Sequence, residues 1–391
     1  MTTRLVPSAL LLVQDRLSRP PLQNWAESIR RRLEEELTGG GNVARIASLL
    51  NLTALLESLR GDRPTARAIC DAELVWLANV ASQRSERSAI STLALQPWIN
   101  IGRLCRTEGR IEEALHHFAL VLRRAVHEPL ALGPYRITGE DWEALLTSDA
   151  LEVLWNVYVV DSLKTYFQFR LFDAALAFIA ELREAKLYRW DNVLQEGELV
   201  SRAGLGDYEG AYSLAKSWGG QEILDTLVFM LYEASCLALL NRCDQANFLA
   251  RDLISFVTLG GLDSFSAPIT MRYLDGLGAL LEDLARQVDA ARIYDRAYKV
   301  AIGANDQPFQ ISFLLAKIRQ LGDEQHRTLV DTREMLLRDC YYDDILKSEG
   351  LPSKKGNQTF VDLLLTVSTA TSGAFVLQSP GLKDEAPARL M

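Results

Sequence analysis

Histidine is scarce in this sequence, which limits the metal sites that it can build. Its four histidines are His116, His117, His127 and His326. Glu113 and His116 have the spacing of a di-iron ligand pair, but such a site needs a second Glu-x-x-His and two further glutamates. Neither is evident in the sequence. We therefore expect no metal or other cofactor, and we expect Glu113 and His116 on an exposed helix face.

Cysteine is also sparse, and no two cysteines have C-x-x-C spacing. The five are Cys70, Cys105, Cys236, Cys243 and Cys340. An odd number of scattered thiols in apolar surroundings favours a reducing compartment over a disulfide framework. Cys105 could act as a nucleophile with His116 or His117, but it occupies a packing position of a helix. We expect Cys105, Cys236 and Cys243 to lie in the core.

Several catalytic motifs are missing from the sequence. There is no phosphate-binding G-x-x-x-x-G-K-[ST] loop, no strand-linked G-x-G-x-x-G and no G-x-S-x-G elbow. Asp343 and Asp344 begin like the Asp-rich, Mg-binding stretch of isoprenoid cyclases, but Lys347 stands where that stretch needs a third acid. A charged helix end is the simpler interpretation. The sequence leans away from an enzyme without deciding the question.

Long hydrophobic runs and an excess of positive charge are absent as well. No window approaches the roughly 18 uncharged apolar residues of a membrane-spanning helix. The apolar stretch Val6–Val13 is followed at once by Gln14 and Asp15, so we expect no signal peptide. A net charge of -9 disfavours nucleic acid and anionic lipid as partners. We expect a soluble, cytoplasmic protein.

The sequence is rich in helical patterning, and the clearest example is the stretch 98–124. Apolar and small residues recur at three-and-four spacing in two runs, which are broken at residues 107–110. This pattern predicts a helical hairpin. Gly102 and Ala114 are both small, so we expect the two helices to approach closely there, with Trp98 and Phe118 filling the space on either side.

This stretch resembles the tetratricopeptide repeat, whose 34-residue signature is W-x2-L-G-x2-Y, then A-x3-F, then proline. The matching residues are Trp98-x2-Ile101-Gly102-x2-Cys105, Ala114-x3-Phe118 and a late Pro129. A second good match is Leu277-Gly278-x2-Leu281 followed by Ala290-x3-Tyr294. The resemblance implies an all-α fold, a right-handed superhelical α-solenoid of stacked helical hairpins, whose first helices line a concave groove.

The alanine of the second motif half recurs at positions 66, 114, 175, 211, 246 and 290. The steps between them are 48, 61, 36, 35 and 44 residues, so the array is irregular. We expect an N-terminal extension and capping helix over 1–41, with Asn24 as its N-cap, then repeats over 42–303. Capping helices over 304–347 and a partly ordered tail over 348–391 follow.

The longest step contains an expected insertion at residues 128–146. It carries Pro129, Gly133, Pro134 and Gly139, and we expect a loop followed by a short helix over 141–146. Aromatic residues are concentrated nearby, between Tyr135 and Trp190. An alternative function is therefore an enzyme or small-molecule binder that uses this insertion as a pocket wall.

The preferred hypothesis is a non-catalytic adaptor or scaffold, or a peptide-responsive regulator of the same type. The resemblance places partner-binding residues on the first helices: Asn51, Arg103, Arg106, Lys164, Gln168 and Arg272. Arg103, Arg106 and Lys164 could together bind a carboxylate or an acidic peptide. The expected partner is therefore a protein or peptide, and the sequence leaves the oligomeric state open.

Overall fold

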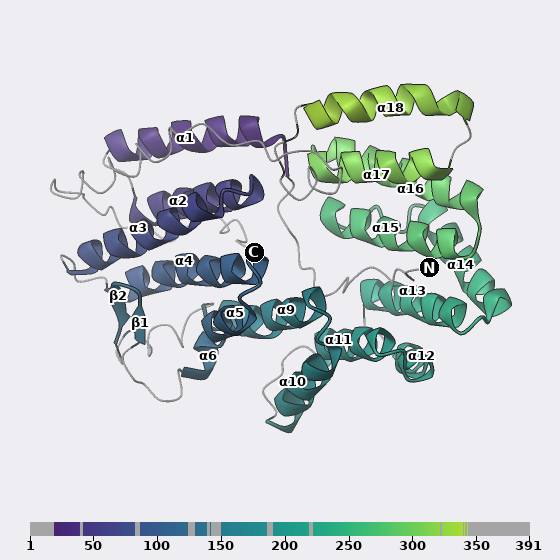
Figure 1. Cartoon of the computed structure of the whole chain (residues 1–391), viewed down its shortest axis with the longest axis horizontal. Coiled ribbons are helices and arrows are strands. Elements are labelled where there is room, and N and C mark those ends of the chain that lie inside the picture. The colour runs from purple at the N-terminus through teal and green to yellow at the C-terminus, as the bar shows by residue number, and fades with distance from the viewer. Residues whose placement is uncertain are drawn as a thin grey trace. The chain divides into compact units, whose positions relative to one another are not determined.

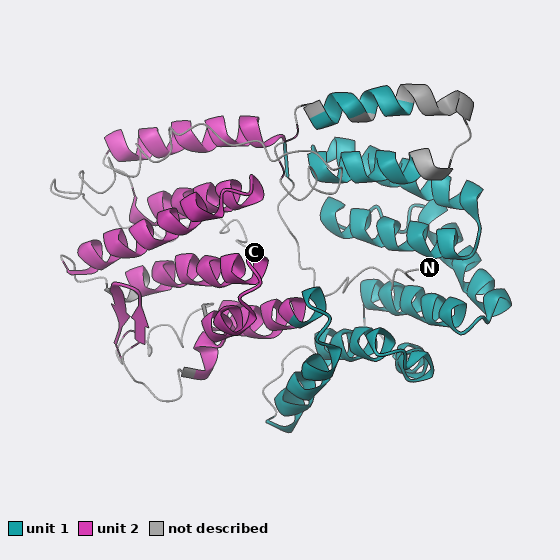
Figure 2. Cartoon of the chain, in the orientation of Figure 1, with its two compact units in different colours: residues 1–20, 166–339, 389–391 teal, residues 21–165, 340–388 magenta. Residues whose placement is uncertain are grey.

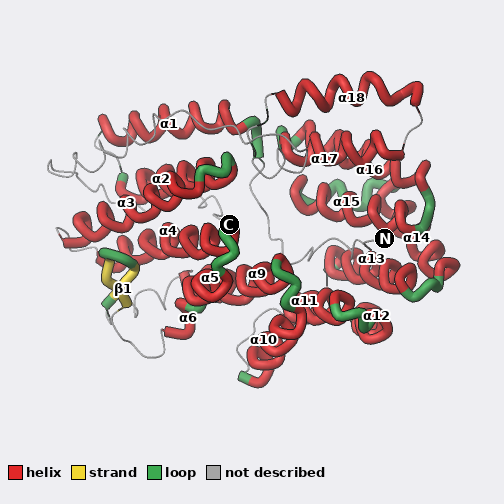
Figure 3. The backbone as a smooth tube through the Cα atoms, viewed as in Figure 1, coloured by secondary structure: helices red, strands yellow, loops and turns green. Residues whose placement is uncertain are grey.

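The structure is a computed structural model, and its described part is almost entirely helical (Figures 1 and 3). It describes residues 19–39, 42–82, 87–123, 130–138, 141, 150–185, 191–218, 222–320, 323–338, 340 and 342. Within these residues the one sheet is a pair of three-residue strands. The expected all-α class is confirmed. No helix in the described part has the length and apolar character that crossing a bilayer would need.

The chain divides into two compact units (Figure 2). The first contains residues 19–20 and 166–338, and the second contains residues 21–165 together with Cys340 and Tyr342. We call them unit 1 and unit 2. The division after Thr165 lies within a helix, inside the stretch 42–303 that the sequence assigns to repeats.

Unit 2 is built from consecutive helices that pack on one another in chain order. They are α1 (Leu22–Thr38), α2 (Val43–Leu59), α3 (Arg63–Ser82), α4 (Arg87–Thr107), α5 (Ile111–Phe118), α6 (Leu120–Arg123), α8 (Ala150–Asn156), the π-helix η2 (Val157–Asp161) and the start of α9 (Ser162–Gln168). The first helices α2 and α4 also contact each other. This is the packing expected when successive hairpins stack.

Unit 1 continues the same pattern of neighbouring helices. It contains the end of α9, then α10 (Phe172–Glu184), α11 (Asp191–Gly204), α12 (Tyr208–Ser217), α13 (Ile223–Leu239), α14 (Cys243–Thr258), α15 (Ala267–Asp283), α16 (Gln287–Gly303), α17 (Gln307–Gln320) and α18 (Asp323–Arg338). A large core cluster joins α13 to α17. At its edge Arg19 hydrogen-bonds by backbone groups to Asp306 and Gln307 at the start of α17.

Six hairpins share one turn geometry. Each turn precedes one of the recurring alanines at positions 66, 114, 175, 211, 246 and 290, which we call the key alanines. The residue five positions before each alanine has a positive φ: Gly61, Gly109, Arg170, Gly206, Asn241 and Ala285. The next N–H then bonds to the carbonyl five residues back, as in Arg110 to Cys105 at 2.9 Å. This hydrogen bond closes a helix C-terminus in a Schellman arrangement. All six alanines are buried, so the repeat predicted from their spacing has a physical counterpart.

The predicted close approach within the hairpins is confirmed, although the partner of the small residue differs from the expectation. A Cβ added to Gly102 would lie 2.6 Å from the Cβ of His117 and 2.8 Å from the ring of Phe118. A Cβ added to Gly278 would lie 2.5 Å from the ring of Tyr294. The glycine therefore makes room for the large side chain four residues after the key alanine. The corresponding positions of another hairpin carry Ala234 and Ala250, which are both buried in the same core cluster.

The insertion contains a β-hairpin that the sequence reading did not predict. Strands β1 (Leu130–Leu132) and β2 (Tyr135–Ile137) pair in antiparallel register across Gly133 and Pro134. Gly133 has a φ of 59°, which suits the first central position of a tight hairpin turn. The expected helix over 141–146 falls almost wholly outside the described residues.

Two local expectations from the sequence were wrong. Helix α1 begins at Leu22 with Pro21 as its cap, before the predicted Asn24, because Leu22 continues the buried stripe of the helix. Cys243 is exposed because it is the first residue of α14 and precedes the buried face that starts at Ala246.

Replacing Ala285 by glycine should stabilise the protein. Ala285 has a φ of 56°, where a Cβ is strained and glycine is not. We expect Ala285→Gly to raise the free energy of unfolding by ~1 kcal/mol. Gly109→Ala is the matched reverse substitution and should destabilise the protein. Its Cβ would meet no atom within 4 Å, so only the strain of a Cβ at a φ of 80° would act. Urea unfolding followed by circular dichroism measures both, and equal stability of the three proteins would contradict the turn assignment.

Replacing Gly278 by alanine should destabilise unit 1. The new Cβ would push on the buried ring of Tyr294, so we expect a loss of ~1–3 kcal/mol in the free energy of unfolding. Gly303→Ala in α16 is the control, since its Cβ meets nothing within 4 Å. That variant should be neutral or slightly more stable in thermal and urea unfolding. A Gly278→Ala protein as stable as the control would mean that close packing does not constrain this hairpin.

Candidate functional site

Two of the predicted arginines converge on one carboxylate, and together they form the best-organised charged site among the described residues of unit 2. Arg103 and Arg106 lie three residues apart, so they share a face of α4. Nη2 and Nε of Arg103 lie 2.8 and 3.2 Å from Oδ2 of Asp161. Nη1 of Arg106 lies 2.8 Å from Oδ1 of the same group. We call Arg103, Arg106, Asp161 and Lys164 the basic cluster.

Asp161 reaches the arginines from an irregular helical segment. It ends the π-helical stretch η2, which joins α8 to α9. A π-helical turn holds an extra residue and changes the direction in which the following side chains point; such turns are frequent at functional sites. The hydroxyl of Thr165 donates a 2.7 Å hydrogen bond to the Asp161 carbonyl within the same unit. The carboxylate is thus held by a buried, hydrogen-bonded helix segment.

The electrostatics of the basic cluster keep Asp161 ionised. Burial alone would raise the pKa of this carboxyl, but the guanidinium groups of Arg103 and Arg106 lower it further than burial raises it. Lys164 contributes in the same direction. Three cations therefore surround one anion, which leaves the basic cluster positively charged in a chain of net charge -9.

The two arginines differ in their exposure to solvent. The side chain of Arg103 is 36% exposed, whereas that of Arg106 is 15% exposed. The guanidinium carbon of Arg106 also lies 5.9 Å from the ring centroid of Phe118, the residue accommodated by Gly102. Arg106 is therefore fixed by the hairpin core, and Arg103 is the arginine better placed to meet a ligand.

Asn51, another predicted groove residue, is buried and belongs to a chain of side-chain amides that continues through the half-buried Asn100 and Gln96. Its Nδ2 donates to Glu73 at 2.8 Å, and its Oδ1 accepts from Asn100 at 2.9 Å. Gln96 in turn donates to Asn100 at 3.1 Å. Burial raises the pKa of Glu73 well above its ordinary value, although the hydrogen bond from Asn51 opposes the shift. Asn51 thus makes its hydrogen bonds inside the helix packing.

The other predicted residues do not all come together. Lys164 belongs to unit 2 with Asn51 and both arginines, whereas Gln168 and Arg272 belong to unit 1. Gln168 is exposed, and Arg272 is half-buried on α15. The structure therefore groups Arg103, Arg106 and Lys164 at one place, and it adds Asp161, which sequence reasoning missed. An acid directly after the apolar run Val157–Val160 was the signal that could have found it.

The residues considered for catalysis pack as structural groups. Burial raises the pKa of the Cys105 thiol, which disfavours a reactive thiolate. Burial lowers the pKa of His117 to about 4, and its ring lies 4.2 Å from that of Trp98. In the insertion, Tyr135 is buried and its hydroxyl lies 2.7 Å from that of Ser91. Across the part of the chain that the structure describes, no three His, Cys, Asp or Glu side chains could hold a metal ion together.

Removing the Asp161 charge should destabilise the protein in a pH-dependent way. Because its folded pKa lies below the ordinary value of 3.8, the ionised group contributes stability above that pH. The contribution is lost as the pH falls toward the folded pKa. We expect Asp161→Asn to lower the free energy of unfolding by ~2–4 kcal/mol at neutral pH, with a smaller difference near pH 3. Urea unfolding at several pH values measures this.

Glu73→Gln provides a control of opposite sign. The raised folded pKa of Glu73 means that its stabilising protonated form is fully present below 4.5 and lost as the pH rises. The glutamine variant should therefore gain stability over the native protein as the pH rises above that value. Parallel pH profiles for the two variants would contradict the assigned electrostatics.

The basic cluster has the chemistry to bind an anion, because guanidinium and ammonium groups form strong charge-assisted hydrogen bonds with a carboxylate. The carboxylate of Asp161 is engaged by both arginines, which leaves it poorly placed to act as a base. Comparisons of the chain with protein-family models, with curated proteins and with solved structures give no match.

Proposed function

We propose that this chain is a non-catalytic, tetratricopeptide-like adaptor or scaffold of the cytoplasm, which binds an acidic segment or a C-terminal carboxylate of a partner protein. The observation that carries the proposal is that the Asp161 carboxylate accepts hydrogen bonds from both Arg103 and Arg106. A carboxylate that fixes two guanidinium groups on one helix face prepares them for a second carboxylate. Ligand binding then needs little ordering of these side chains.

The repeated hairpins support the adaptor part of the proposal. Six turns of the same geometry, each followed by a buried alanine, stack first helices such as α2 on α4 and α13 on α15. Stacked hairpins of this kind generate extended surfaces from side chains of successive first helices. A right-handed superhelix with a concave groove is the arrangement that we propose for them.

The geometry of Arg103 supports a carboxylate ligand. Asp161 uses the edge formed by Nε and Nη2, and a guanidinium has further N–H donors on its other edges. Lys164 lies near enough to lower the pKa of Asp161, so it adds to the positive potential that a partner carboxylate would meet. Ion pairs of this kind fix the orientation of the bound partner and speed its association more than they strengthen its binding.

Capture of partners from the source cells tests the proposal. We expect the native protein to recover specific polypeptides, and Arg103→Gln to weaken that recovery by about tenfold because a charged hydrogen bond to the ligand is lost. A synthetic peptide from the acidic or C-terminal segment of the recovered protein should show the same ratio in a titration. Arg103→Gln leaves Arg106 paired with Asp161, so the fold should persist by circular dichroism.

Arg67→Gln is the matched control, because it removes an equal charge from an exposed ion pair with Asp71 on α3 of the same unit. Recovery should be unchanged in this variant. Unchanged recovery in both variants, or turnover of a small molecule by the purified protein, would contradict the proposal.

A further inference from the structure

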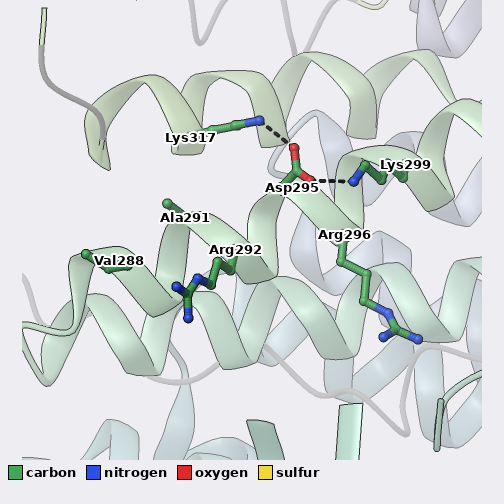
Figure 4. Close-up of a pocket in the computed structure, with 7 residues that line it drawn as sticks. All are labelled: Val288, Ala291, Arg292, Asp295, Arg296, Lys299 and Lys317. Carbon is green, nitrogen blue, oxygen red and sulfur yellow. Dashed lines mark hydrogen bonds and ion pairs between the residues drawn. The ribbon is translucent and has the colours of Figure 1, made fainter. Parts of the chain in front are cut away.

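A second charged surface lies in unit 1, along α16. An open groove of about 630 Å³ is lined by Val288, Ala291, Arg292, Asp295, Arg296, Lys299 and Lys317. Six of these residues belong to α16, and Lys317 reaches in from the neighbouring α17 (Figure 4). Four lining residues are cations and one is an acid, so the lining carries more positive than negative charge, and two further acids beside it, Asp263 and Asp289, pair with Arg296 and Arg292.

The single acid of the groove organises its cations. Asp295 accepts a hydrogen bond from Lys317 on one oxygen and forms an ion pair with Lys299 at 2.8 Å on the other (Figure 4). These contacts lower the pKa of Asp295 even though burial alone would raise it. Asp295 thus holds two ammonium groups beside the groove.

The cations of the groove have different roles. Arg296 is fixed by 2.6 Å and 2.9 Å hydrogen bonds to the Val257 carbonyl and to Asp263. Arg292 and Lys299 have side chains that are 78% and 73% exposed, and the nearest acid to Arg292 is Asp289 at 3.8 Å. Arg292 and Lys299 are therefore the groove cations best placed to contact a partner.

We propose that this groove is a docking surface for an acidic, extended segment of a partner polypeptide. Arg292 and Lys299 lie seven residues apart on one helix, which separates them by about 10 Å along its axis. On an extended peptide the side chains of one face recur about every 7 Å, so the long, exposed side chains of Arg292 and Lys299 must cover the remaining ~3 Å to meet two neighbouring carboxylates. Val288 and Ala291 add an apolar end against which a neighbouring side chain of the peptide can pack.

The chemistry of the groove favours a peptide over other anions. A single phosphate could meet only one of the two separated exposed cations. Single-stranded nucleic acid is usually bound with aromatic side chains that stack on bases, and none of the seven lining residues is aromatic. The net charge of -9 also opposes a long polyanion or an anionic membrane, whereas a short acidic segment feels mainly the local cations.

This inference is independent of the proposed partner site at the basic cluster. The basic cluster belongs to unit 2, and the groove belongs entirely to unit 1. The effect of a substitution at one site on binding can therefore be measured while the residues of the other site stay unchanged.

Fluorescence anisotropy of a labelled hexaglutamate peptide with the full chain at low salt tests the groove. We expect saturable binding that weakens with salt. The double variant Arg292→Glu and Lys299→Glu should weaken binding by about tenfold or more, because two exposed charge contacts become repulsive. Asp295→Asn should strengthen binding by about threefold, because the lysines lose their internal partner.

Arg31→Glu with Arg45→Glu is the matched control, since it changes the net charge equally at two arginines of unit 2 that are 73% and 72% exposed. Its affinity should stay within about twofold of the native protein. Circular dichroism verifies that each variant is folded. Because hexaglutamate can also bind the basic cluster, the comparison is repeated in the Arg103→Gln protein, where the loss caused by the groove double variant should persist; this separates failure of this inference from failure of the proposed function.

Three outcomes would overturn the inference. The first is absence of hexaglutamate binding, or equal loss of binding in the groove variant and in the control. The second is competition by inorganic phosphate at the concentrations at which the peptide itself binds. The third is tighter, groove-dependent binding of oligothymidylate or of phosphatidylserine vesicles, which would assign the groove to another class of anion.

Discussion

The close contact between the two helices of each hairpin constrains the rest of this structure. Each contact begins with a left-handed turn residue, and five residues later an alanine is buried in the interface. In two hairpins the side chain four residues beyond the alanine fills the space left by a glycine of the facing helix: Phe118 at Gly102 and Tyr294 at Gly278. In the hairpin of Ala175 both corresponding positions carry large buried residues, Leu163 and Ile179. At the two glycines, a larger side chain would therefore need a smaller partner on the facing helix.

The basic cluster depends on that same contact. Arg106 lies against Phe118, which occupies the space that Gly102 leaves, so the core of the hairpin fixes one of the two guanidinium groups. Asp161 comes from a π-helical segment, which places an acid at a point where a regular helix would present a different side chain. The charged site is thus built on the stacking of helices, and its position follows from their packing.

Much of the helical order could be predicted from spacing, because buried alanines and turn residues leave a strong periodic signal. Two turns lack this signal, because Arg170 and Ala285 adopt a positive φ that glycine usually supplies. At these turns the packing of the hairpin overrides the local preference for glycine. Helix α4 begins at Arg87 and passes through Pro97, although proline usually ends a helix. Among site residues, Arg103 and Arg106 were found from the repeat resemblance. Asp161 was not, since its contact with them joins residues about sixty positions apart.

Neither compact unit is continuous in the sequence. Unit 2 is formed from residues 21–165, but the buried residues Cys340 and Tyr342 also belong to it, and they follow the whole of unit 1. During synthesis, residues 166–338 leave the ribosome before Cys340 and Tyr342 do. Unit 2 can therefore be completed only after the chain of unit 1 has been made. The positions that Cys340 and Tyr342 occupy in unit 2 therefore stay unfilled while residues 166–338 are being made, and this is the interval in which chaperones would act on the earlier part of the chain.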